Sequence, residues 1–220
     1  MASTHLRGGA PLPTPTLLVG THVRLEPLTV GHEADLSEAG RAPEIWTYLP
    51  TVHAPFQSRE MTRQWMDEAF AQQATGWRWP FAIVWQATGR VIGSTSYVDF
   101  HWPDRALEIG WTWLTPAYWR TVVNTQCKYL LLQYAFETLG MYRVQLITDS
   151  RNQRSQRAIE RLGARKEGVL RSHILCPDGY RRDSVVYSIL DYEWPAVRDR
   201  LAAALHRTSG AALSQMQTRG

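Results

Sequence analysis

The sequence is poor in cysteine and has no long apolar run. Cys127 and Cys176 are the two cysteines among 220 residues, too few for a disulfide framework. No stretch of about 18 uncharged apolar residues occurs, so we expect no membrane-spanning helix and no membrane partner. The first residues lack the apolar segment of a secretory signal. Together these absences favour a cytoplasmic protein.

The motifs of several enzyme classes are also missing. The sequence contains no Gly-x-Ser-x-Gly elbow, no HExxH pair, no paired CxxC and no Walker-type glycine loop. The seven histidines are not spaced like metal ligands, so we expect no metal. What is present, 44% apolar and 20% charged residues, is typical of a globular domain with a full core.

Charge is unevenly distributed along the chain. The net charge is +4, but residues 1–19 and 207–220 carry +3 of it, which leaves +1 for residues 20–206. A nucleic-acid-binding protein is therefore disfavoured. One local surplus remains, with eight basic and three acidic residues between Arg143 and Arg171. This surplus suits a small polyanion, and a solvated helix face is the alternative.

Apolar periodicity predicts a mixed α/β (α+β) chain without repeats or an internal linker. In the first half we expect helices at 31–41 and from the N-cap Ser58 to Ala74, and strands at 22–28, Pro80–Gln86, Val91–Phe100 and Leu107–Leu114. Hairpin-type turns join the last three strands, which predicts an antiparallel meander.

In the second half, Asn124 and Thr125 provide an N-cap for a helix at 125–139. It is followed by strand Val144–Thr148, helix Asn152–Leu162 closed by Gly163, strands Val169–Cys176 and Ser184–Leu190, and a helix from Tyr192 to about His206. We therefore expect one domain over residues 17–206, with a flexible lead-in at 1–16 and a flexible tail at 207–220.

Several segments in this order match a known family. They are HVRLEPLT, PEIWTYLP, VIGSTSYVDF, ALEIGWTWL, NTQCKYLLLQYAFETLG, RVQLITDSRNQRSQRAIERLGARKEGVLR and PDGYRRDSVVYSILDYEWP. Over roughly residues 17–200 the chain resembles the GNAT acetyltransferase superfamily, specifically its RimJ/RimL-like N-acetyltransferases. The resemblance implies a mostly antiparallel sheet, flanked by helices, whose strands Leu107–Leu114 and Val144–Thr148 splay apart.

The resemblance also implies that acetyl-CoA binds in this splay as the co-substrate. Backbone groups of Trp113 and Leu114 would pair with the pantetheine arm, Asn152 would hydrogen-bond to it, and Ser155 would lie near the thioester sulfur. The pyrophosphate would lie at a turn and helix N-terminus, formed by Thr121, Val122, Val123, Asn124 and Thr125.

The sequence departs from the family signature, Gln/Arg-x-x-Gly-x-Gly/Ala, at the phosphate turn. Val122 stands where glycine is expected, and no glycine lies between Trp111 and Leu139. Glycine permits close backbone approach and a positive φ, but valine also supplies the N–H group. Two functions stay open: an N-acyltransferase that moves an acetyl group from acetyl-CoA to a primary amine, or a protein of this fold that has lost ordinary acetyl-CoA turnover and binds a ligand or uses another acyl donor.

Two carboxylates are candidates for the general base of such a transfer. Glu108, on the strand next to the splay, is the first candidate and would act on the acceptor amine through water. The alternative is an ion pair with an arginine such as Arg105. Glu167 is the second candidate, but its place in a strand-entry turn favours a pair with Arg165 or Arg171.

Three further positions have competing interpretations. Ser155 is the candidate proton donor to the departing thiolate, against an ordinary helix-surface serine. Cys127 is expected to be a packed cysteine and not a nucleophile, since no histidine adjoins it. Trp46 and Tyr48 are the best-placed aromatic pair for an acceptor pocket, although most of the ten tryptophans belong in the core. The acceptor would be an amine on a protein N-terminus, an amino acid or a small molecule, and a homodimer stays open.

Overall fold

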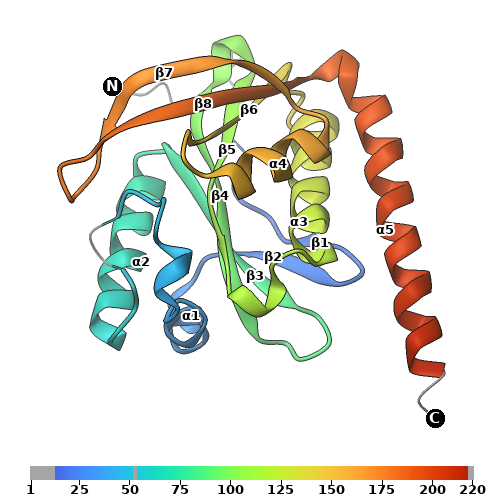
Figure 1. The fold of residues 1–220 in the computed structure, drawn as a ribbon, viewed down its shortest axis with the longest axis horizontal. Helices are drawn as coiled ribbons and strands as arrows, with labels where there is room; N and C mark the ends of the chain where they lie inside the picture. The colour runs from blue at the N-terminus through green and yellow to red at the C-terminus, as the bar shows by residue number, and fades with distance from the viewer. Residues whose placement is uncertain (1–12, 52–53, 218–220) are drawn as a thin grey trace.

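An eight-stranded sheet organises the computed structural model, which describes residues 13–51 and 54–217, with side chains to residue 207 (Figure 1). The strand order is β1-β2-β3-β4-β5-β6-β8-β7. The strands are β1 (Leu18–Val19), β2 (Val23–Pro27), β3 (Arg78–Trp85), β4 (Val91–His101), β5 (Ala106–Leu114), β6 (Arg143–Asp149), β7 (Arg165–Leu175) and β8 (Arg181–Leu190). Every pairing is antiparallel except that of β5 with β6. The predicted fold class and the β3–β4–β5 meander are confirmed.

Helices cover both faces of the sheet. The longer ones are α1 (Glu33–Ala39), α2 (Arg59–Ala74), α3 (Val122–Gln133), α4 (Gln153–Leu162) and α5 (Trp194–Gln217). Helices α1 and α2 pack on one face over a core that includes Trp65, Phe56 and Trp113. Helices α3 and α5 lie on the other side, where the core contains Leu131 and Tyr187 (Figure 1). Each core buries the apolar face of its helices against the same sheet.

Strands β5 and β6 separate after a short parallel pairing. Their register joins Ala106 to Arg143 and ends at Glu108 with Gln145. Beyond that point β5 continues alongside β4, whereas β6 pairs with β8 along its whole length. A bulge at Trp111, whose φ is +50°, shifts the register of β5 on β4 and re-aims the residues that follow. The predicted split of the sheet between these two strands is confirmed.

Local sequence determines several helix ends as predicted. The Ser58 hydroxyl accepts a hydrogen bond from the Met61 N–H at 3.2 Å and caps α2. The Asn152 side chain caps α4 in the same way, and that helix ends at Gly163 in the left-handed conformation, with φ +93°.

Several boundaries differ from the sequence prediction by three residues or more. Helix α3 begins at Val122, capped by Thr121, and not at Thr125. Strand β7 begins at Arg165, so Glu167 lies within a strand and not in a turn. Helix α5 runs to Gln217, past the predicted end near His206.

No helix in the part of the chain that the structure describes is both long enough and apolar enough to cross a membrane. The expected lead-in at 1–16 falls largely outside the described residues. The domain limits and the flexible tail at 207–220 stay predictions.

Candidate active site

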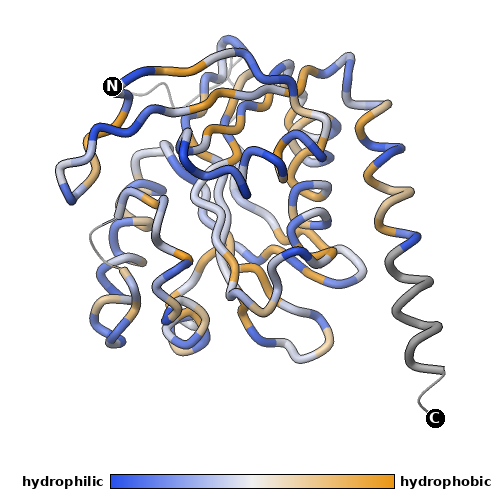
Figure 2. The backbone as a smooth tube through the Cα atoms, viewed as in Figure 1, coloured by the Kyte–Doolittle hydropathy of each residue, from blue (hydrophilic) through white to orange (hydrophobic). Residues whose placement is uncertain are grey.

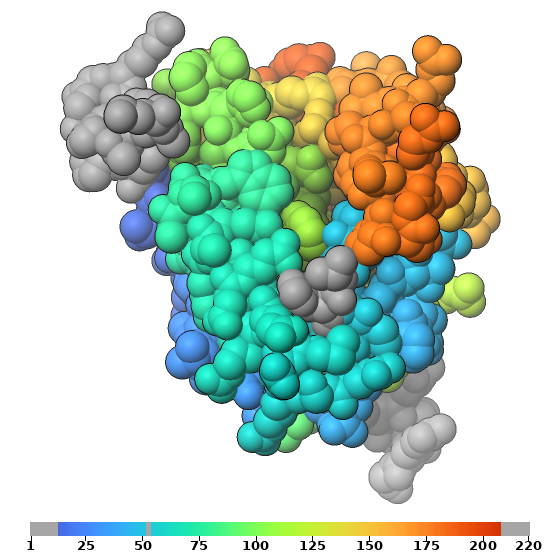
Figure 3. Space-filling view, turned by 90° about the vertical axis from the view of Figure 1, so that its left-hand side faces the viewer, coloured from blue at the N-terminus to red at the C-terminus, as the bar shows by residue number. Residues whose placement is uncertain are grey.

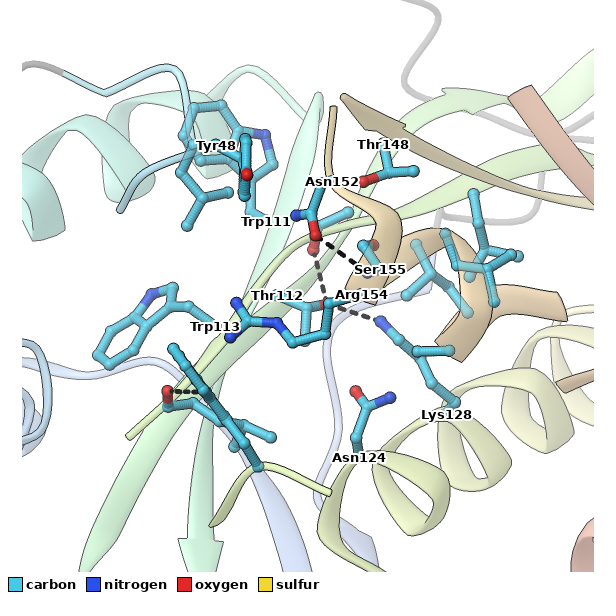
Figure 4. Close-up of a pocket in the computed structure, with 18 of the residues that line it drawn as sticks. Tyr48, Trp111, Thr112, Trp113, Asn124, Lys128, Thr148, Asn152, Arg154 and Ser155 are labelled. Atoms are coloured by element: carbon cyan, nitrogen blue, oxygen red, sulfur yellow. Dashed lines mark hydrogen bonds between the residues drawn. The ribbon is translucent and has the colours of Figure 1, made fainter. Parts of the chain in front are cut away.

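A cavity of about 230 Å³ lies where β5 and β6 part. Residues of both strands line it, together with the first turns of α3 and α4, the segment after α1, and Arg182 of β8. Figure 4 shows side chains from these separate elements converging on one space. A concave site at a break in a sheet, lined by a few polar groups, is typical of ligand binding.

The N-termini of α3 and α4 both border the cavity. The Thr121 hydroxyl accepts from the Val123 N–H at 3.3 Å, and the Asn152 side chain accepts from the Ser155 N–H at 3.0 Å. The remaining first-turn N–H groups have no partner within their helices, and the helix dipole adds positive potential there. Two such ends facing one space favour an anionic ligand.

Val122 takes an ordinary helical conformation as the first residue of α3. The left-handed residue of this turn is Arg120, with φ +60°. Valine is therefore unstrained at position 122, because the backbone there does not need the positive φ that glycine tolerates.

Arg154 reaches over the cavity from α4. Its guanidinium carbon lies 3.6 Å from the centre of the Trp119 ring, and the Trp119 indole N–H donates to the Leu114 carbonyl at 2.8 Å. No carboxylate pairs with Arg154 among the described residues. An aromatic face thus positions a cation without neutralising its charge.

Lys128 is a buried cation that sequence reasoning missed. Only 5% of its surface is exposed, and its Nζ donates to the Thr112 hydroxyl at 2.6 Å (Figure 4). Burial lowers the pKa of Lys128 to about 8, although Cys127 and Glu108 act in the opposite direction. The sequence contained a signal that Lys128 is buried near the site. Lys128 follows Asn124 by one helical turn and lies on the helix face that continues into buried leucines.

Glu108 lies at the fork, in the last residue pair that joins β5 to β6. Burial raises the pKa of Glu108 to about 7, which a hydrogen bond from Gln145 partly offsets. Glu108 does not line the cavity itself, but Ile109 and Gly110, which follow it, do. Arg105 does not pair with it: the Arg105 guanidinium lies over the Tyr142 ring, at 5.0 Å.

The cavity opens between the α1–α2 segment and the β7–β8 hairpin. The Arg151 guanidinium lies 3.6 Å from the Tyr180 ring and 5.7 Å from the Tyr48 ring, so it joins the two sides of the opening. Asp149 holds Arg151 through hydrogen bonds of 2.8 and 3.1 Å. In the space-filling view the hairpin and this segment border a hollow (Figure 3).

The structure brings together eight of the site residues predicted from sequence. The cavity is lined by Tyr48, Trp113, Leu114, Thr121, Asn124, Thr125, Asn152 and Ser155. Four others, Glu108, Val122, Val123 and Trp46, lie behind or beside its wall. Trp46 is buried: its indole N–H donates to the Gly40 carbonyl at 2.8 Å and its ring packs 5.1 Å from that of Trp113.

The two remaining candidates, Glu167 and Cys127, have environments that favour a structural role. Glu167 accepts hydrogen bonds from Arg143 at 2.6 Å and from the Ser188 hydroxyl at 2.7 Å, and the Arg143 contact, larger than the opposing effect of burial, lowers its pKa to about 2. Its predicted partners, Arg165 and Arg171, were wrong. Burial raises the pKa of Cys127 to about 12, so its thiol stays protonated at neutral pH, in agreement with a packed cysteine.

Comparisons with known proteins agree with this geometry. The profile of the acetyltransferase (GNAT) domain matches residues 22–165. The uncharacterized N-acetyltransferase YoaA of Bacillus subtilis is 30% identical over 122 residues, which cover 56% of this chain and 67% of that protein.

Two solved structures extend the comparison. An acetyltransferase from T. thermophilus is 40% identical, with a TM-score of 0.78 over 88% of this chain and 99% of that one. RimJ from Mycobacterium smegmatis, solved in complex with CoA-disulfide, is 23% identical, with a TM-score of 0.71 over 83% of this chain and 88% of that one, and shares the fold. The chain therefore belongs to the GNAT acetyltransferase family, and its enzyme class is that of an N-acetyltransferase.

Proposed function

We propose that the protein transfers the acetyl group of acetyl-CoA to a primary amine. One observation carries the proposal: cations at the splay are held by neutral groups, Lys128 by a hydroxyl and Arg154 by an indole ring. Their charge stays available for a ligand that is itself anionic, and a nucleotide-linked thioester meets that need.

The residues around the cavity fit such a ligand. The α3 N-terminus, from Thr121 to Thr125, presents amide groups suited to a pyrophosphate, with Arg154 above it. Among the described residues, no strand lies beside the edge of β5 from Trp111 to Leu114 on the β6 side, so its backbone groups suit an extended pantetheine arm. The Asn152 amide N–H₂ is not used in capping α4 and suits a carbonyl of the same arm. Acetyl-CoA would supply the activated acyl group.

Glu108 is the base that this proposal requires. A carboxylate with a pKa near 7 can accept a proton at neutral pH and release it again, which a surface glutamate does poorly. Because Glu108 lies behind the cavity wall, a water molecule would carry the proton from the amine to the carboxylate. The acceptor would enter through the hollow that the α1–α2 segment and the β7–β8 hairpin border, which suits the exposed amine of a peptide, an amino acid or a small molecule (Figure 3).

Isothermal titration with acetyl-CoA, followed by a panel of peptide and small-molecule amines with thiol detection, tests the proposal. We expect binding and amine-dependent release of CoA. Binding without release for every amine would favour a ligand-binding protein of this fold. The absence of binding at millimolar acetyl-CoA would contradict the proposal.

A further inference from the structure

Lys128 is a buried ammonium group that no carboxylate of the described residues contacts directly, although the charge of Glu108 acts on it from a distance. Its one hydrogen bond among the described residues goes to the Thr112 hydroxyl, which lies 2.8 Å from that of Thr95. A buried charge held only by neutral groups is costly and is retained where a function needs it.

Lys128 lies close to the part of the splay where the acyl group of a bound donor would react. Its side chain extends from the second turn of α3 across to Thr112 on β5, one residue past the bulge at Trp111 (Figure 4). The fork with Glu108 lies on one side of this point along β5, and the α3 N-terminus lies on the other. A donor with its phosphates at α3 and its acyl group toward Glu108 would therefore have its sulfur near Thr112 and Lys128.

We propose that Lys128 is a catalytic residue of this enzyme, the acid that protonates the departing thiolate. The inference rests on the acetyl-CoA-dependent function proposed above. It assigns to Lys128 the role that the sequence suggested for Ser155, whose hydroxyl also lines the cavity. An ammonium both stabilises an anionic sulfur and gives it a proton, whereas a neutral serine hydroxyl is a far weaker acid.

The step balances in protons and electrons. The amine nitrogen forms a bond to the acyl carbon, the carbon–sulfur bond breaks, and its electron pair leaves on sulfur. Lys128 Nζ gives its proton to that sulfur, and the proton lost by the amine passes through water to Glu108. The products are an amide and CoA thiol, and solvent returns a proton from Glu108 to Lys128.

The proposal has a test that needs no acceptor. The thiol of CoA is titrated in its complex with the protein by thiolate absorbance, with desulfo-CoA as the blank. An ammonium beside the sulfur should lower the pKa of the bound thiol by about one to three units. The desulfo-CoA blank subtracts any signal of the protein's own thiols, Cys127 and Cys176, and burial raises the pKa of both.

Three variants give the contrast. Lys128→Met should return the bound thiol to the pKa of free CoA and lower kcat by about 10²–10⁴-fold while acetyl-CoA still binds. Lys128→Arg should keep the lowered thiol pKa but not the rate, since arginine does not release its proton in this range. Lys166→Met is the matched control, because this other lysine of the chain is exposed on β7, and it should change neither quantity.

The outcomes separate this inference from the proposed function. If the wild type neither binds nor turns over acetyl-CoA, the proposed function fails and the inference fails with it. If the wild type is active and Lys128→Met keeps its rate and its thiol pKa, only the inference is overturned. Full activity in Lys128→Arg would also overturn the inference. Loss of acetyl-CoA binding in both Lys128 variants, if they are folded, would overturn it too, because a role of Lys128 in binding would then explain the loss of activity.

Discussion

The two sides of the cleft hold their positive charges in different ways. Toward α3 and α4, Lys128 is bound by a hydroxyl and Arg154 by an aromatic ring. At the opening on the β6–β8 side, Arg151 is instead paired with Asp149. Lys128 and Arg154 keep their charge for an incoming anion, whereas the charge of Arg151 is neutralised within the fold.

This difference separates the cations suited to binding a ligand from the cation that stabilises the fold. Hydropathy alone does not reveal it, since the hydrophilic stretch that leads into α4 in Figure 2 contains both Arg151 and Arg154. The partners make the difference: a carboxylate next to Arg151 makes it part of the scaffold of the opening, and an indole beneath Arg154 leaves its charge for the proposed ligand.

The largest expected effect comes from the one carboxylate at the fork. Glu108→Gln should lower kcat by about 10²–10⁴-fold and leave acetyl-CoA affinity nearly intact, because the base acts on the amine. Since the carboxylate must be ionised, the activity of the wild type should rise with pH through about 7. This rising limb of the pH profile should be absent in the variant. With Lys128 as acid, a second limb should fall above about 8.

Glu60→Gln is the matched control, because Glu60 is exposed in the first turn of α2 and does not line the cavity. It should leave both limbs unchanged. Steady-state rates from pH 6 to 10 check both variants. If the Glu108→Gln variant shows the pH profile of the wild type, Glu108 is not the general base.

A second prediction concerns the cost of burying the Lys128 ammonium group against a neutral hydroxyl. Lys128→Met should raise the free energy of unfolding at pH 7 by roughly 1–3 kcal/mol, as replacements of buried charges by apolar groups often do. The pKa of Lys128 falls from 10.5 to about 8 on folding, so the unfolded chain binds more protons between these values. Wild-type stability should therefore increase with pH across that window, and the increase should be absent in the variant.

Urea unfolding at pH 7 and pH 10 measures this difference. Lys166→Met, on exposed β7, should show no such gain. A less stable Lys128→Met protein at pH 7 would mean that the ammonium supports the fold instead of straining it.

The sequence predicted the fold well because its elements carry local signals. Ser58, Asn152 and Gly163 are caps whose chemistry is visible without tertiary structure. The start of α3 was misplaced because Asn124 and Thr125 look like a cap, whereas the chain turns earlier, at Arg120, and Thr121 caps the helix. A left-handed arginine gives no local signal, since it is set by how β5 joins α3 in space.

The site was less predictable because roles there depend on neighbours from distant elements. Trp46 and Tyr48 are two residues apart, yet one is buried against Trp113 and the other lines the cavity. The partner of Glu167 proved to be Arg143 on another strand. Lys128 was read as part of a helix motif, and its hydrogen bond to the neutral Thr112 hydroxyl emerged only when β5 was placed beside it.

A third prediction compares two arginines on α4. Arg154→Ala should weaken acetyl-CoA binding by roughly tenfold at low salt, and the loss should shrink as added salt screens the exposed charge. Arg157, one turn away, is exposed and does not line the cavity, so Arg157→Ala is the control. Titration calorimetry at two salt concentrations measures both. Equal losses in the two variants would indicate a general positive field in place of a phosphate contact.

The smallest expected effect is at Val122, where the sequence departs from the family signature. Since Val122 is helical and the left-handed φ belongs to Arg120, Val122→Gly relieves no strain. The glycine should instead lower the free energy of unfolding by at most about 1 kcal/mol through backbone entropy. Acetyl-CoA affinity should stay within about twofold, because either residue offers the same N–H group. Calorimetry and urea unfolding of this variant check both values, and tighter binding of tenfold or more would show that the valine side chain blocks the phosphate turn.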